Sequence, residues 1–510
     1  MKGPHNIWRL IRTGATFERT GAMTVALEAM EVSPRLRFAA RMLGLPFRWL
    51  GLKGDPALPP VTRAITALGP AYIKFGQILS TRPDIVGAEL ADQLKYLQDQ
   101  LPPFPQAEAH AAVRAELGQP VEVLFSSFSE PVAAASIAQV HRARLADSGE
   151  EVAVKVLRPG IERAFRRDID AFYLAARWIE ILAPFSRRLR PVDVIAHFEG
   201  VVTGELDLRL ECASAAEFAA NTEKDGGLVV PRPHWGLSGR TVLTIDWAEG
   251  IGLNDLAAID AAGIDRVELS RRVLTLFLSH ALRDGYFHGD MHQGNIKVMP
   301  DGRLVVYDFG IMGRLDEYTR RVYAEILMGF IRKDYRRVAE VHFEAGYVPA
   351  DRDIDEFARA LRSVGEPIFG MEANRISMAR LLSYLFEVTE RFGMETRTEL
   401  ILLQRTMVVV EGVSRSLDPH LNIWEVSRPV VEDYIRASVG PKAILRDLAR
   451  TARVLARFGP KLPALTEAAL VRLGNPDVAP RPAGGRARLV RGVIGAVAFL
   501  ALGVAIGAAL

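Results

Sequence analysis

Three polar residues near the middle of the chain have the types and spacing that phosphoryl transfer requires. Asp290 and Asn295 lie five residues apart in the stretch 287–295, FHGDMHQGN, and Asp308 follows in an Asp-Phe-Gly sequence. An acid and an amide supply the oxygen ligands that Mg²⁺ prefers, and a separate aspartate can orient or deprotonate a nucleophile. The sequence therefore predicts an Mg²⁺ site at Asn295 and Asp308, with Asp290 as the catalytic base.

The segment between these residues reads as two short strands joined by a turn. Apolar pieces at 296–298 and 304–306 flank the turn-forming sequence Pro-Asp-Gly at 300–302. This pattern is typical of a β-hairpin, which would bring Asn295 and Asp308 close together.

Lys155 lies in the middle of a predicted strand, 151–157. Alternation along that strand places three valines on one face and Lys155 on the other. Protein kinases hold a phosphate-binding lysine in such a strand, within the sequence V-A-I-K. A lone lysine in an edge strand is more often a solvated side chain, but the downstream Asp-Phe-Gly sequence favours the phosphate-binding interpretation.

The loop before this strand pair carries Ala133, Ala134, Ala135 and Ser136 where a kinase carries glycines. Glycines let backbone N–H groups approach phosphates closely, and each added Cβ narrows the backbone choices. We expect these four residues to line a nucleotide site that grips its ligand differently, with altered selectivity or slower turnover.

Two predicted helical regions, 61–101 and 160–223, carry further charged residues. Lys74 and Gln77 are three residues apart and share a helix face, and the intervening Gly76 permits close approach of another element. Taken alone, a lysine and a glutamine on a helix are usually solvated.

Three acids follow at Glu205, Asp207 and Glu211. On one continuous helix, Asp207 and Glu211 share a face and Glu205 lies off it. An active kinase pairs a glutamate with its strand lysine, so we expect one of these acids to pair with Lys155. A solvated acidic face is the alternative.

Composition bounds the class of protein. The 510-residue chain is 49% apolar and 8% aromatic, which excludes a disordered chain. Its one cysteine, Cys212, excludes a disulfide framework and fits a reducing compartment. The formal net charge of +3 is uneven, because the segment from Arg436 onward has twelve Lys/Arg and three Asp/Glu. A basic tail suggests an anionic partner, and nothing in the chain suggests nucleic acid.

The last 19 residues, 492–510, carry no charged side chain and are long enough for a transmembrane helix. Arginines at 486, 488 and 491 precede them, as at a cytoplasmic flank. A buried C-terminal helix is the alternative, disfavoured by the Pro/Gly-rich linker at 476–485. Gly503 and Gly507 form a small-xxx-small face that favours helix pairing, so a dimer is among the expected assemblies.

Two further stretches point toward a membrane surface. Arginines at 446, 450, 453 and 457 line one face of a predicted helix and suit anionic lipid headgroups. Residues 1–60 alternate basic and apolar groups, which fits a membrane-surface helix or a packing extension equally. They contain no secretory signal, so we expect the body of the protein to be cytoplasmic.

Taken in order, these motifs resemble the UbiB family of atypical kinase-like proteins of ubiquinone biosynthesis. The resemblance covers about residues 60–475 and the C-terminal anchor. It implies an α+β, bilobal protein-kinase-like fold with a small β-containing N-lobe and a helical C-lobe. The expected divisions are an N-terminal extension (1–60), a helical extension with the Lys-x-Gly-Gln motif (61–120), the N-lobe (121–245), the C-lobe (246–475), a basic linker (476–491) and a transmembrane anchor (492–510).

The resemblance also implies roles. Lys155 would contact the α- and β-phosphates of ATP and pair with Glu211, while Asn295 and Asp308 would hold Mg²⁺ and Asp290 would be the catalytic base. The Lys-x-Gly-Gln helix would fold over the active site, with Lys74 and Gln77 against Glu205 and Asp207. A protein substrate would then be shut out, which favours an ATPase over a protein kinase.

The chain departs from the family at two positions of the catalytic loop, where Met291 and Gln293 replace prolines, and only one membrane segment is found where many relatives have two. The implied function is a Mg²⁺-dependent ATPase of the inner membrane that acts on or presents polyprenyl quinone precursors, together with other ubiquinone-biosynthesis enzymes. A small-molecule kinase of the aminoglycoside or choline kinase type and a non-catalytic nucleotide-binding scaffold are the alternatives.

Overall fold

The computed structural model describes residues 4–29, 44–80, 102–182, 190–369, 391–394 and 398–439, with isolated positions at 34–42, 90–97 and 388. The described chain forms two compact units. The first holds the residues up to Ala213 together with Pro233–Trp247, and the second holds Ser214–Arg232 and the residues from Ala248 onward.

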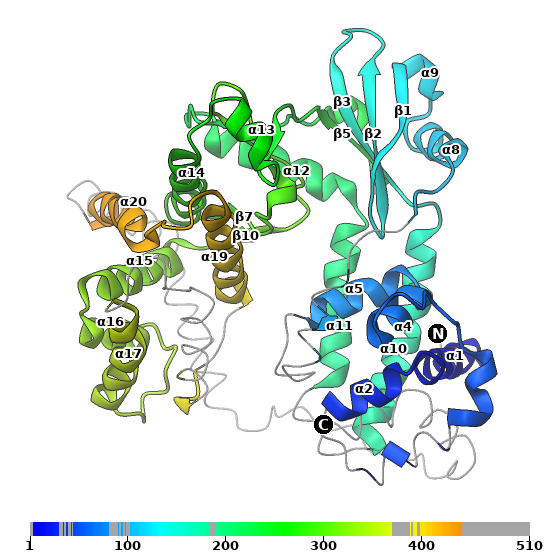
Figure 1. Ribbon diagram of the computed structural model, residues 1–510, viewed down its shortest axis with the longest axis horizontal. Coiled ribbons are helices and arrows are strands. Elements are labelled where there is room, and N and C mark those ends of the chain that lie inside the picture. Colours follow the sequence, from blue (N-terminus) through cyan, green and yellow to red (C-terminus); the bar gives the residue numbers. More distant parts are fainter. Residues whose placement is uncertain are drawn as a thin grey trace, which may run out of the picture. The chain divides into compact units, whose positions relative to one another are not determined.

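The first unit contains a four-stranded antiparallel sheet in the order β1 (Phe125–Ala134), β2 (Ala138–Leu145), β3 (Glu151–Leu157) and β5 (Val242–Asp246) (Figure 1). Val152, Val154 and Val156 of β3 are fully buried in one hydrophobic cluster with Val113 of helix α8 (Gln106–Leu117). The predicted alternation is confirmed, because burying three valines on one face turns Lys155 to the other.

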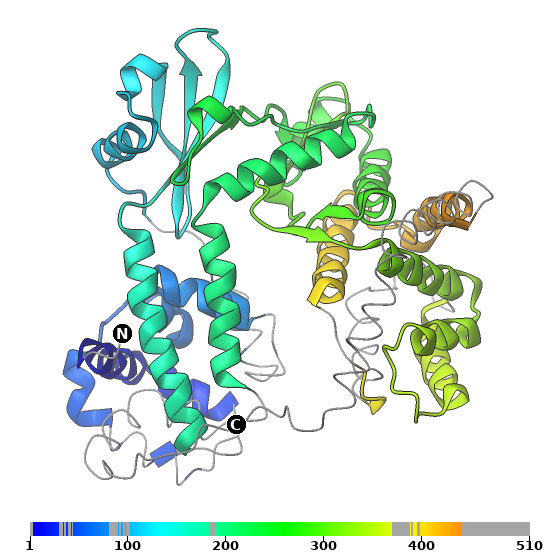
Figure 2. The same ribbon diagram turned by 180° about the vertical axis from the view of Figure 1, so that it is seen from behind.

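Helices make up the rest of the first unit. They are α1 (Pro4–Thr20), α2 (Ala22–Ala29), η1 (Leu45–Leu50), α4 (Pro60–Leu68), α5 (Pro70–Leu79), α9 (Val121–Leu124), α10 (Ile161–Leu182), α11 (Pro191–Glu205), the first residues of α12 (Leu208–Thr222), and η3 (Trp235–Leu237). In both views α10 and α11 run side by side (Figure 2).

Helix α5 packs on α10 and α11 through aromatic rings. The Phe75 ring lies 5.1 Å from both Phe172 of α10 and Phe198 of α11, centroid to centroid. A Cβ on Gly76 would lie 2.5 Å from Leu97 Cδ1. The predicted close approach at Gly76 is therefore confirmed, and a larger residue there would push the 94–97 segment away.

Helix α1 packs on the first unit, as the packing alternative predicts for this part of residues 1–60. Leu10 is buried against α10, the hydroxyls of Thr13 and Tyr72 share a buried 2.6 Å hydrogen bond, and Arg9 pairs with Asp168.

The acidic stretch is not one helix, contrary to the prediction. Helix α11 ends at Glu205 and α12 begins at Leu208. The Asp207 carboxylate accepts hydrogen bonds from the backbone N–H (3.2 Å) and the side chain of Arg209. Such local bonds compete with helix formation. Because Asp207 lies between the two helices, it does not share a helix face with Glu211.

The second unit holds two small sheets. One pairs β7 (Tyr286–His288) with β10 (Met312–Arg314), and the other has the order β4 (Leu228–Val229), β9 (Leu304–Val306), β8 (Ile296–Val298), β6 (Ile251–Gly252). Ile296 of β8 pairs with Val306 of β9 in antiparallel register, so the predicted hairpin is confirmed.

The remaining elements of the second unit are helical. They are the later part of α12, α13 (Leu256–Ala261), α14 (Arg266–Ser279), η4 (His280–Asp284), η5 (Gln293–Asn295), α15 (Glu317–Arg332), α16 (Tyr335–Glu344), α17 (Ile354–Phe369), α19 (Thr398–Leu417) and α20 (Ile423–Val439). Helix α14 ends at Ser279, and η4 continues it as a π-helical turn that leads into β7.

The predicted linker, basic helix and transmembrane anchor (476–491, 446–457 and 492–510) lie outside the described residues. Within the described part of the chain, no helix combines the length and apolar character needed to cross a membrane.

Candidate functional site

One group of candidate residues lies in the first unit, where β3 and α12 bring an ion pair together. Lys155 Nζ lies 2.9 Å from both carboxylate oxygens of Glu211. The side chains are 20% and 9% exposed, so the pair is shielded from water but open on one side. Of the three candidate acids, Glu211 is the partner of Lys155.

The alanine-rich loop is a tight turn that connects β1 to β2. Ala133 pairs with Val140 and Ala134 with Gln139 in the β1–β2 register, and Ala135 N–H donates to the Ala138 carbonyl at 2.8 Å. Ser136 is fully buried. The strands thus run almost to the tip, and backbone N–H groups that an open glycine loop would offer to phosphate are partly used within the loop.

Lys74 and Glu205 form a second ion pair, between α5 and α11. Lys74 Nζ lies 2.8 Å from Glu205 Oε2, with both side chains under 15% exposed. Gln77 makes a long 3.4 Å bond to the Leu97 carbonyl. Asp207 pairs with Arg209, and that hydrogen bond lowers the pKa of the Asp207 carboxyl. The predicted meeting of Lys74 with Glu205 is present in the structure, whereas Asp207 turns to Arg209.

A second group of candidate residues lies in the second unit, on the loop after β7. Asn295 Nδ2 donates to the Asp290 carbonyl at 3.0 Å and lies 3.4 Å from Asp290 Oδ2. The Asp290 side chain is about one-third exposed. Because its amide nitrogen is the donor in both contacts, Asn295 presents its amide oxygen on the opposite side of the group.

Asp308 has a left-handed backbone (φ 63°), which an aspartate tolerates better than most residues. The preceding residue, Tyr307, donates its N–H to the Asn295 carbonyl at 3.1 Å. An amide oxygen and a carboxylate at adjoining ends of one hairpin fit Mg²⁺, which usually takes one or two protein carboxylates and completes its shell with phosphate and water. Among the described residues, no three or more His, Cys, Asp or Glu side chains cluster in a way that could hold a metal ion.

His288 links the loop that carries Asp290 to the chain just before Asp308. Its Nδ1 accepts from Asp290 N–H at 3.1 Å, and its Nε2 donates to the Tyr307 carbonyl at 3.2 Å. Burial lowers the pKa of His288, and the two bonds require the neutral Nε2–H form. Sequence reasoning assigned no role to this histidine, although its place two residues before Asp290 was a usable signal.

Gly289 stands where kinases carry an arginine, and the packing explains it. A Cβ there would lie 2.9 Å from Ile311 Cγ2 and 3.2 Å from Leu402 Cδ1. Thr406 of α19 donates its hydroxyl to the Gly289 carbonyl at 3.0 Å. A Cβ at this position would crowd Ile311 and Leu402. The loop therefore has no arginine side chain here, and the Thr406 hydroxyl of α19 holds its backbone.

The two unusual loop residues are both accommodated. Met291 is buried in the main hydrophobic cluster of the second unit. Gln293 Nε2 donates to Ser416 Oγ of α19 at 2.7 Å. A proline at 293 could not make that bond, so this chain ties its loop to α19 by a side-chain hydrogen bond.

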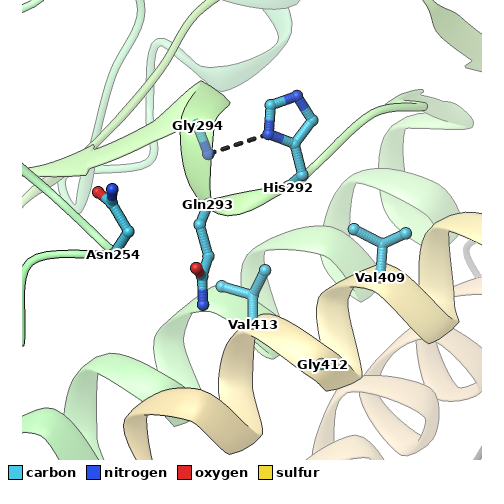
Figure 3. Close-up of a pocket in the computed structure, with 7 residues that line it drawn as sticks. All are labelled: Asn254, His292, Gln293, Gly294, Val409, Gly412 and Val413. Carbon is cyan, nitrogen blue, oxygen red and sulfur yellow. Dashed lines mark hydrogen bonds between the residues drawn. The ribbon is translucent and has the colours of Figure 1, made fainter. Parts of the chain in front are cut away.

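A pocket of about 470 Å³ opens beside the loop. In Figure 3 the Gln293 side chain points toward Val413 of α19, and His292 lies on the other side of the loop with Nδ1 bonded to Gly294 N–H. His292 Nε2 is 3.5 Å from Asp290 Oδ2. The lining residues are Asn254, His292, Gln293, Gly294, Val409, Gly412 and Val413. Sequence reasoning missed this pocket, because α19 lies more than one hundred residues from the loop.

Comparison with known proteins identifies the family. The model of the ABC1 atypical kinase-like domain matches residues 96–342, and that of the UbiB helical domain matches residues 361–422. The protein named "Probable protein kinase UbiB" from Xanthomonas axonopodis pv. citri is 41% identical over 456 residues, which cover 84% of this chain and 82% of the relative. This chain belongs to the UbiB family. The resemblance predicted from the ordered motifs is confirmed.

Two further curated proteins and one solved structure are also similar to this chain. The proteins of the same name from Azotobacter vinelandii and Marinobacter nauticus are 40% and 39% identical, covering 87% and 80% of this chain and 83% and 76% of their own. A solved structure of Rv3197 with erythromycin, from Mycobacterium tuberculosis, is 26% identical, covers 70% of this chain and 90% of its own, and has a TM-score of 0.48.

Proposed function

We propose that this UbiB-family protein is a membrane-associated, Mg²⁺-dependent ATPase that supports ubiquinone biosynthesis. The observation that carries the proposal is the ion pair of Lys155 with Glu211, both oxygens at 2.9 Å. Active kinase-like sites need this pair in place. A chain that had lost nucleotide chemistry would have no reason to keep a shielded ammonium there.

Each residue then has a defined task. Lys155, held by Glu211, contacts the α- and β-phosphates of ATP, and the Ala133–Ser136 loop lines the nucleotide. Asn295 and Asp308 would hold Mg²⁺, which would supply positive charge to the phosphate oxygens. Asp290, about one-third exposed, orients the attacking nucleophile and accepts its proton.

Water is the proposed nucleophile. The Lys74–Glu205 pair fixes α5 on α11, and in this proposal the Lys-x-Gly-Gln helix shuts out a protein substrate. The work of hydrolysis goes to polyprenyl quinone precursors, which the protein extracts from or presents at an anionic membrane, with other ubiquinone-biosynthesis enzymes nearby. In this proposal, the word "kinase" in the relatives' printed name describes their fold and not the transfer of phosphate to a protein.

A second candidate is phosphoryl transfer to a small molecule. The pocket beside His292 favours it, because about 470 Å³ suffices for a small hydroxylated acceptor near Asp290. A small-molecule acceptor bound there would dissociate with phosphate on its hydroxyl group. The product therefore separates the two functions: a phosphorylated small molecule for the kinase, inorganic phosphate for the ATPase.

The proposal is tested in cells that depend on this gene for ubiquinone. We expect Lys155→Met and Asp290→Asn to lose quinone and accumulate an early polyprenylated precursor. The matched control is Arg144→Met, which removes an exposed cation from the neighbouring strand. Normal quinone levels in both site variants, at normal protein levels, would refute the proposal.

A further inference from the structure

A short segment of the first unit exposes large apolar side chains in an unusual concentration. Trp49 is 75% exposed, Phe38 67%, Met42 52% and Leu45 41%. Single exposed apolar residues are ordinary on a protein surface. Four within twelve residues form the kind of patch that marks an interaction site.

The backbone at residues 49–52 is held against α1, so the exposure of Trp49 does not arise from a loose end. Arg19 of α1 donates to the carbonyls of Trp49 (3.4 Å) and Gly51 (2.7 Å). The Leu52 N–H donates to Thr16 Oγ1 at 3.0 Å. A Cβ on Gly51 would lie 2.2 Å from the Ala15 carbonyl oxygen. The main chain is pressed onto α1, and Leu45, Arg48 and Trp49 of η1 are exposed.

The charge around these residues favours a lipid surface as the partner. The stretch 33–54 contains five basic residues and no Asp or Glu: Arg35, Arg37, Arg41, Arg48 and Lys53. Arg37 pairs with Glu28 of α2 at 2.7 Å, which leaves an excess of positive charge in the stretch. A second copy of the chain would place like charges against each other. Tryptophan and leucine flanked by arginine and lysine are typical of segments that lie in the headgroup region of an anionic bilayer.

We propose that η1, together with the exposed side chains of Phe38 and Met42, docks on an anionic membrane surface, with Leu45 and Trp49 at headgroup depth and Arg48 and Lys53 on lipid phosphates. This deepens the membrane association in the proposed function, and it does not require ATP hydrolysis. It also gives the folded N-terminal extension a contact with lipid that is independent of the predicted C-terminal anchor.

The test uses the full chain in vesicles, with a fluorescent label on an introduced cysteine. Native Cys212 is fully buried, so Leu45→Cys labels selectively. Val123→Cys is the matched control, since Val123 is an exposed apolar residue of α9 in the same unit. Quenching by bromolipids in phosphatidylglycerol vesicles should be at least several-fold greater at 45 than at 123. It should drop in neutral vesicles and in the Arg48→Glu/Lys53→Glu background.

Equal quenching at the two labels, or no effect of the charge reversals, would overturn the proposal. A label at 45 that is already shielded in lipid-free protein would also overturn it, because another part of the chain or a second copy would then cover the patch. Measuring ATP hydrolysis of the same charge-reversed protein in detergent keeps this test separate from the proposed function. We expect hydrolysis in detergent to be unchanged.

Discussion

At the scale of single residues, nucleotide chemistry depends on the contact between Lys155 and Glu211. Lys155→Met should lower ATP turnover by roughly 100-fold, because one charge-stabilising group leaves a preorganised site. Glu211→Gln should cost less, about tenfold, since the amide keeps a hydrogen bond but loses the charge. Phosphate release under saturating ATP measures both, and Arg144→Met is the control. Turnover unchanged in Lys155→Met would remove the lysine from the mechanism.

A second residue-scale prediction concerns the tie between the catalytic loop and α19. Gln293→Ala and Ser416→Ala should each lower turnover by about fivefold, the effect of roughly 1 kcal/mol from one hydrogen bond. The double variant should be no worse than either single variant, because both remove the same 2.7 Å bond. Additive losses of activity would show that the two side chains act separately.

Residues that act through local patterns were predictable from sequence, and residues held by distant elements were not. The orientation of Lys155 could be predicted because strand alternation depends only on the neighbouring residues. The loop's attachment by Thr406 and Ser416 is not readable, because those contacts join residues more than one hundred positions apart. Asp207 was misplaced because the helical region breaks between Glu205 and Leu208, where Asp207 bonds Arg209 instead of continuing the helix. Gly204, just before the break, was the one local signal.

At the scale of elements, the Lys74–Glu205 pair joins α5 to α11. Lys74→Met and Glu205→Gln should each destabilise the first unit, because a largely buried charge loses its partner at 2.8 Å. A double-mutant cycle read from urea unfolding should give a coupling of about 1–3 kcal/mol. A coupling near zero would mean that this contact does not hold the two helices together.

Helix α16 gives the second unit a pH dependence. Burial lowers the pKa of His342 from 6.5 to about 4, against the opposing effect of its bond to the Val338 carbonyl. Between these values the unfolded chain binds a proton that the folded chain does not, so stability falls as the pH drops from about 6.5 toward 4. The slope from this one group is at most about 1.4 kcal/mol per pH unit.

Unfolding of wild type and His342→Gln at several pH values measures this effect. The variant should be less stable at pH 7, since His342 packs against Tyr347 and Phe357, but its stability should fall less steeply below pH 6.5. Parallel pH curves would contradict the assignment.

Element types were largely predictable, whereas element ends were not. The β8–β9 hairpin carries its own turn sequence, and the valine alternation of β3 needs only its neighbours. The π-helical turn at His280–Asp284 was missed. There His280 and Arg283 bond Asp225, 55 and 58 positions away, a partner that local periodicity does not reveal.

At the scale of the whole molecule, the order of motifs along most of the chain predicted membership of the UbiB family, and the family models and curated relatives show it. No single motif was decisive in the sequence, and the family models match the kinase-like and helical regions separately. Membrane association is a proposal with two independent supports, the apolar segment 492–510 and the exposed basic patch around Trp49. Either support can fail without affecting the nucleotide chemistry.

The most direct measurement is Mg²⁺-dependent release of inorganic phosphate from γ-labelled ATP by the purified full chain, compared with Asp308→Asn. Asparagine also tolerates the left-handed backbone of position 308, so this change removes the charge with little strain. We predict labelled inorganic phosphate from wild type with Mg²⁺, and roughly 100-fold less from the variant or without Mg²⁺. Label that appears on an organic acceptor, or release that the variant retains, would contradict an ATPase built on Asp308.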